Sequence, residues 1–142
     1  MTARMNPNKK QWALLVYIAG HNDLSLFGTT NLDELSNEGA AAHVYAAVQI
    51  HTMDPTIGPA RYEIAERDWL GIGHRTLIER LKDEMDTGDP ATLSRFLQWG
   101  LERFPAENTL AVIWGHGSGF QGARRAIADD AYVVSSEPTS VR

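Results

Sequence analysis

One histidine stands out because of its position in the chain. His116 follows the apolar run 110–114 and lies between Gly115 and Gly117. Apolar, partly β-branched residues that end abruptly at glycine are typical of a strand buried on both faces of a sheet. The imidazole would then lie at the edge of the sheet where open α/β folds bind their ligands. Because imidazole titrates near neutral pH, His116 is the candidate catalytic residue, able to take a proton from a nucleophile and return it to a leaving amine.

The residues after His116 leave two kinds of chemistry open. The Gly117 N–H, with no side chain beside it, could donate to the oxyanion of an acyl-transfer intermediate, although a plain tight turn explains this glycine equally well. Ser118 does not form a nucleophile elbow, because Gly-x-Ser-x-Gly requires glycine where His116 stands. The string His-Gly-Ser-Gly could still be the oxyanion loop of an α/β-hydrolase whose nucleophile follows downstream.

The other candidate ligands and nucleophiles carry weaker signals. His43, His51 and His74 are expected to be structural or exposed, and His21, in a loop after a strand, has only a minor claim to function. The five histidines are scattered, and Asp129–Asp130 alone offers too few ligands for a cation, so we expect no metal and no cofactor. The absence of cysteine excludes a disulfide, a thiolate zinc site and a thiol nucleophile within these 142 residues.

Composition indicates one modest globular domain. A hydrophobic content of 43% and a charged content of 22% are ordinary for a soluble protein. The net charge of −5 argues against nucleic acid as the main partner. The N-terminal apolar run, residues 12–19, is too short to span a membrane, and no small-residue cleavage site follows it, so we expect no membrane association and a cytoplasmic location.

Hydrophobic periodicity places the candidate residues on an α/β scaffold. Buried strands are predicted at 12–19, 44–50 and 110–114, and a short outer strand at 61–64. Helices are predicted at 31–37, 74–85 and 89–105; Asp89 would cap the last of these, with Pro90 in its first turn. Apolar strands alternating with helices predict a parallel sheet covered on both faces.

The character of the chain changes after the candidate site. Residues 1–120 are expected to form the folded part, whereas 121–142 are polar and are expected to be an exposed linker or a processed tail. The sheet therefore looks unfinished. Its apolar edge would make the isolated chain poorly soluble.

Four stretches resemble the clostripain family of cysteine peptidases, which are caspase-like in fold. They are WALLVYIAGHNDL at 12–24, NLDEL at 31–35, GDPATLSRFLQWGLERFPAEN at 88–108 and LAVIWGHGSGF at 110–120. The resemblance implies a caspase-like three-layer α/β sandwich with a mostly parallel sheet. That sheet would be incomplete in this chain and completed by a second chain.

The same resemblance implies roles for individual residues. His116 would be the histidine of a Cys-His dyad, and Gly117 would supply an oxyanion-hole N–H. The catalytic cysteine would lie on the next strand, in a partner segment beyond Arg142. The family implies protein or peptide substrates cleaved after basic residues, and maturation by cutting of the linker near Arg142, with Arg124 and Arg125 as a second candidate site. Any calcium requirement cannot be placed on this chain.

Two alternatives stay open at this point. The chain could be a fragment of an α/β-hydrolase with a downstream serine nucleophile, which a Gly-x-Ser-x-Gly elbow in the continuing sequence would establish. It could also be a non-catalytic, caspase-like regulatory module, for which replacing His116 would leave function intact.

Overall fold

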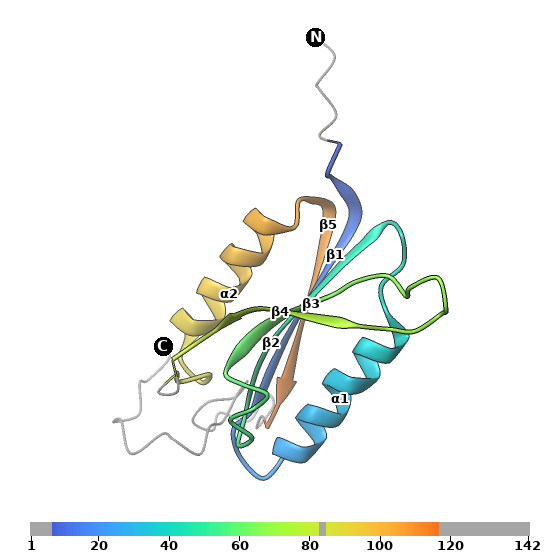
Figure 1. The fold of residues 1–142 in the computed structure, drawn as a ribbon. Coiled ribbons are helices and arrows are strands. Elements are labelled where there is room, and N and C mark those ends of the chain that lie inside the picture. The colour runs from blue at the N-terminus through green and yellow to red at the C-terminus, as the bar shows by residue number, and fades with distance from the viewer. Residues whose placement is uncertain (1–6, 83–84, 117–142) are drawn as a thin grey trace.

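The computed structural model describes residues 7–82 and 85–116, which form one sheet with a helix on each face (Figure 1). The elements in chain order are β1 (Lys10–Gly20), α1 (Ser25–Glu38), β2 (Val44–Thr52), β3 (Ala60–Ile64), β4 (Arg75–Arg80), α2 (Pro90–Arg103) and β5 (Ala106–Gly115). The strand order is β4-β3-β2-β1-β5. No helix in this described part is long and apolar enough to cross a membrane.

The sheet is mixed: β1, β2, β4 and β5 run in one direction and β3 runs opposite to them, which is consistent with the expected mostly parallel sheet. β1 pairs in parallel with both β2 and β5. β2 pairs antiparallel with β3, and β3 pairs antiparallel with β4. The reason is local: β3 follows β2 after the short segment 53–59, and a connection that short returns the chain antiparallel, whereas a parallel crossover needs a dozen or more residues.

The core has two layers, one on each face of β1. Val16 and Ile18 pack with Leu32 of α1 on one face. Leu15 and Tyr17 pack with Phe96 of α2 on the other. This alternation follows from the period of two in a strand, and it makes β1 a strand buried on both sides. The described residues therefore form three layers, helix–sheet–helix (Figure 1).

The helix predicted at 89–105 is confirmed as α2. The Asp89 side chain accepts a hydrogen bond from the Ala91 N–H at 2.9 Å, and Pro90 occupies the first turn. The helix predicted at 31–37 is also present, but it begins earlier, at Ser25. Its face toward the sheet carries Gly28, Leu32 and Ser36, and two of these are small or polar, so the apolar stripe that predicts a helix is weak.

The helix predicted at 74–85 is wrong, because residues 75–80 form strand β4. Cross-strand contacts override the helical spacing of the apolar residues. Arg61 of β3 donates from Nη1 to Glu79 of β4 at 2.6 Å and from Nε to Gln49 of β2 at 2.8 Å. Arg61 also lies over the ring of Trp99 on α2, 4.6 Å from its centroid. This chain of contacts joins three strands and a helix.

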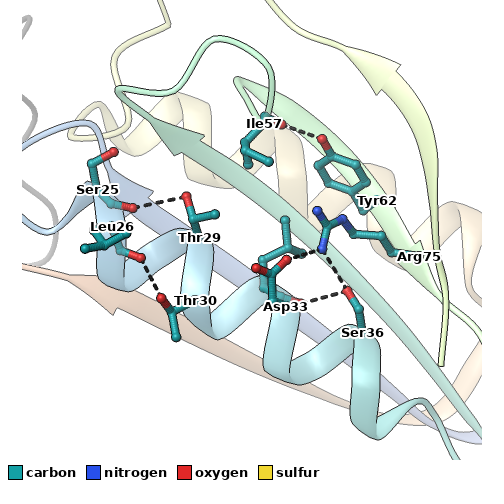
Figure 2. A network of polar contacts seen from close by, with 10 residues as sticks. Ser25, Leu26, Thr29, Thr30, Asp33, Ser36, Ile57, Tyr62 and Arg75 are labelled. Atoms are coloured by element: carbon teal, nitrogen blue, oxygen red, sulfur yellow. Dashed lines mark hydrogen bonds and ion pairs between the residues drawn. The ribbon is translucent and has the colours of Figure 1, made fainter. Parts of the chain in front are cut away.

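Strand β4 is also fastened to helix α1 on the other side of the sheet. Arg75 donates from Nη1 to the Asp33 carboxylate at 2.5 Å and to Ser36 Oγ at 3.3 Å (Figure 2). Ser36 in turn donates to the carbonyl of Leu32. Side-chain contacts thus join β3 to α2, through Arg61, and β4 to α1, through Arg75.

Strand β5 differs from the expectation of a strand buried on both faces. It is the edge of the sheet, and its apolar side chains are exposed: Leu110 by 52%, Val112 by 38% and Ile113 by 40%. Among the described residues, only β1 pairs with it. The expected linker 121–142 lies outside the described residues.

Candidate functional site

The strand order places the candidate site at the carboxyl ends of β1 and β5. From β1 the chain crosses through α1 to β2 on one side, and later returns through α2 to β5 on the other side. Ligands of open α/β sheets bind in the crevice outside the carboxyl ends of the strands where the order reverses in this way. The two strands end in register, with Ala19 opposite Gly115.

His116 follows β5 at this edge, as the sequence predicts. Gly115 immediately before it is required by the close approach of β1, because a Cβ there would lie 2.9 Å from the carbonyl oxygen of Ala19. The His116 side chain is 45% exposed, so its ring is accessible.

The structure brings an unexpected partner to His116. Asp23, 93 residues away in the sequence, places Oδ1 2.5 Å from His116 Nε2. The carboxylate is 81% exposed. Sequence reasoning missed Asp23, although an acidic residue three positions after the end of a buried strand was a visible signal. Only the register of β1 with β5 pairs it with His116.

The loop that carries Asp23 is held at both ends by Asn22. The Asn22 Oδ1 accepts from the Leu24 N–H at 2.9 Å, and the Asn22 carbonyl accepts from the Ser25 N–H at 3.1 Å. The Asn22 amide also donates to the carbonyl of Ala19 at 3.4 Å. This Asx turn connects the end of β1 to the start of α1 and fixes the backbone on either side of Asp23.

The remaining histidines do not join this pair. His21 is buried and packs against His51, with the rings tilted by 35° and their centroids 4.4 Å apart. His43 is exposed. His74 bonds Asp68 at 2.9 Å, which lowers the pKa of the Asp68 carboxyl below its ordinary value. These placements agree with the structural or exposed roles expected for His43, His51 and His74.

Several residues singled out in the sequence lie outside the described residues. They are Gly117, Ser118, Arg124, Arg125, Asp129, Asp130 and Arg142. Within 7–82 and 85–116, no group of three or more His, Asp or Glu side chains is arranged to hold a metal ion.

Comparisons with solved structures place this arrangement in a known fold. A cysteine protease from B. fragilis is 20% identical with a TM-score of 0.65, covering 80% of this chain and 94% of that one. A secreted C11 cysteine protease from Bacteroides thetaiotaomicron, solved with an irreversible peptide inhibitor, is 19% identical with a TM-score of 0.72, covering 87% of this chain and 35% of that one. An inactive zymogen of a C11 protease from Parabacteroides distasonis is 18% identical with a TM-score of 0.70, covering 81% and 33%.

This chain thus spans about a third of the length of the last two proteins. At these identities the likeness shows a shared fold. No curated protein sequence matches the chain. The model of the clostripain family matches residues 16–133, from the core of β1 to beyond His116 and over most of the sequence, and the chain therefore belongs to the clostripain family.

Proposed function

We propose that this chain is the histidine-bearing part of a clostripain-like cysteine endopeptidase. His116 would be the general base and acid, and the cysteine would come from a second polypeptide segment. The observation that carries the proposal is that two features occur together on strand β5. β5 delivers an exposed imidazole at its carboxyl end, and the same strand presents exposed apolar side chains along the sheet edge.

The exposed strand is the argument for a second segment. Leu110, Val112 and Ile113 are residues of a kind that α/β sheets bury. Covering them would remove apolar surface from water, worth roughly 25 cal/mol per Å² buried. A strand from the cysteine-bearing segment, paired with the edge of β5 that no strand among residues 7–82 and 85–116 covers, would help to bury these side chains. It would also bring its own carboxyl end beside His116.

The proposed chemistry follows from the groups at this edge. The imidazole of His116 takes the thiol proton, and the sulfur attacks the peptide carbonyl carbon. The N–H of Gly117 would donate to the oxyanion. The imidazolium then protonates the amine as the C–N bond breaks, leaving a thioester that water hydrolyses. This chain supplies proton transfer and oxyanion stabilisation, so alone it would have no peptidase activity.

Further features of the proposal rest on family membership. We propose cleavage after basic residues, and maturation by cutting between the histidine and cysteine segments, at Arg142 or at Arg124–Arg125. The two-part division, with 1–120 as half of the peptidase domain and 121–142 as linker, belongs to the same proposal. A cytoplasmic location is also proposed; one of the similar structures is described as secreted. No metal or other cofactor is assigned to the chain.

The experiment compares the complete protein with its His116→Ala variant. Peptides with Lys, Arg or Asp before the scissile bond are assayed, together with labelling by an irreversible cysteine-directed peptide inhibitor. We expect labelling of the cysteine segment, cleavage after Lys or Arg only, and a loss of about 10²- to 10⁴-fold in the variant. A complete protein that neither cleaves peptides nor reacts with the inhibitor would overturn the proposal.

Family membership does not favour the α/β-hydrolase alternative, whose nucleophile would be a serine. The regulatory-module alternative is separated by the same variant. If the biological function of the protein persisted in His116→Ala, the chain would act by binding and not by catalysis, as the regulatory-module alternative requires.

A further inference from the structure

We infer that Asp23 is a positioning residue for His116: its carboxylate orients the imidazole that works on the thiol of the Cys-His dyad. The inference rests on the proposed function, which it deepens. Its observation is the contact between Asp23 Oδ1 and His116 Nε2 at 2.5 Å, made across the carboxyl ends of β1 and β5.

The chemistry of the two groups decides which nitrogen does the work. An ionised carboxylate can only accept hydrogen bonds, so the proton between the two groups belongs to His116 Nε2. Nδ1 of the neutral ring is then left as the acceptor, and it is the nitrogen that takes the thiol proton. When the imidazolium forms, its Nε2–H already points at a negative charge, which stabilises the charged ring.

Backbone contacts hold both Asp23 and His116 in place, so the orientation of the imidazole is set before substrate binds. Asp23 lies between residues that Asn22 fixes, since Asn22 bonds the Leu24 N–H, the Ser25 N–H and the Ala19 carbonyl. His116 follows a glycine packed against β1 at the Ala19 carbonyl. Two anchored backbones bring one ring nitrogen, Nε2, to the carboxylate, and this contact does not use the other ring nitrogen, Nδ1.

An alternative explanation is that this is an ordinary surface ion pair. Exposed pairs contribute little to stability, and Asp23 is 81% exposed. The two explanations differ in what removal of the carboxylate does. A surface pair leaves catalysis unchanged, whereas a positioning carboxylate affects kcat and the ring's proton without affecting the fold.

The test uses the complete protein with Asp23→Ala, Asp23→Asn and, as a matched control, Glu34→Gln, which removes one exposed carboxylate charge from α1. We expect Asp23→Ala to lower kcat by about ten- to a hundredfold, with KM changed by less than about twofold. Asp23→Asn keeps an oxygen acceptor but no charge, so its kcat should lie between that of the wild type and that of Asp23→Ala. Glu34→Gln should match the wild type, and all variants should melt at the wild-type temperature.

A second measurement reads the ring directly and does not depend on peptidase activity. With ¹⁵N-labelled histidine, the Nε2–H of His116 should give a low-field proton resonance in the wild type and in Asp23→Asn. The resonance should be lost to solvent exchange in Asp23→Ala. Unchanged kcat in Asp23→Ala, or a low-field resonance that persists there, would overturn the inference. Absence of any His116-dependent cleavage would overturn the proposed function instead, while the resonance would still report on the contact.

Discussion

Asp68 organises the loop between β3 and β4 by accepting three hydrogen bonds. Its partners are the ring of His74 and the backbone N–H groups of Ile72 and Leu70, each at 2.9 Å. The bond from His74, followed by that from Ile72, holds the pKa of the Asp68 carboxyl below its ordinary value of 3.8. A carboxyl whose folded pKa is lowered stabilises the fold above its unfolded pKa, and this stabilisation is lost as the pH falls through the lower folded value.

The loop should therefore keep its order down to the ordinary Asp range and loosen only below it. NMR spectra between about pH 6 and about pH 2 should show the Leu70 and Ile72 amides shifting together with the Asp68 carboxyl, at a pH below 3.8. In Asp68→Asn the two amides should lose this titration. Amides that titrate with the same midpoint in that variant would show that another group controls the loop.

At the same scale, the two residues of the candidate site differ in how far the sequence reveals them. His116 is visible because an apolar run and two glycines mark it locally. Asp23 acquires its role only when β1 and β5 align, which is a long-range fact. His21 illustrates the opposite case: its position after a strand suggests the site, but its side chain is buried against His51. Strand-exit position is readable from the sequence, whereas the direction of each side chain there is not.

At the scale of elements, helix α2 packs closely on β1 at a glycine. A Cβ on Gly100 would lie 2.6 Å from Cδ1 of Leu15, whose side chain is 1% exposed. Alanine would gain about 1 kcal/mol of helix propensity. Overpacking of a buried contact typically costs about 1–3 kcal/mol, so the cost of the close contact should exceed the gain in helix propensity.

Gly100→Ala should therefore lower the free energy of unfolding by about 1 kcal/mol, measured by urea denaturation. The companion is Leu15→Val, which shortens the side chain at the point of contact. The double variant should lose less stability than the sum of the two single variants, because Val relieves the clash. Strict additivity would mean that α2 shifts away from the sheet instead of pressing on Leu15.

The elements themselves were predictable where local chemistry is strong. The start of α2 was recovered because Asp89 and Pro90 are a cap and a first-turn residue. β4 was mistaken for a helix because it has little signal of its own, and its pairing with β3 through Arg61 and Glu79 decides its state. α1 was placed correctly but started too late, since its buried face is built partly from Gly28 and Ser36.

At the scale of the whole molecule, the sheet ends in two different ways. At one edge, β4 is short and charged, with Arg75, Glu79 and Arg80 along it. Such charges discourage pairing with another chain. At the other edge, β5 is longer and carries exposed Leu110, Val112 and Ile113. The sequence predicts this apolar strand and an apolar edge of the sheet, but it places the strand itself as buried on both faces, because burial of β5 depends on what lies beside it and not on its own residues.

The open β5 edge leads to a prediction about association. Leu110→Lys places a charge on the exposed edge strand, where charged residues prevent edge-to-edge pairing. The control is Leu70→Lys, the same change at a side chain that is 61% exposed in the β3–β4 loop, away from β5. Sedimentation of the isolated chain over a range of concentrations should show self-association in the wild type and in Leu70→Lys, and a monomer in Leu110→Lys.

The same pair of variants tests the proposal that this edge receives a cysteine-bearing segment. In the complete protein, Leu110→Lys should abolish peptide cleavage although His116 and Asp23 are untouched, because the lysine stem and charge would have to be buried on a covered face of the completed sheet, at a cost of several kcal/mol. Leu70→Lys should cleave at the wild-type rate. If Leu110→Lys kept full activity while suppressing self-association, the β5 edge would serve only contacts between copies of this chain, and the thiol would have to reach His116 from another direction.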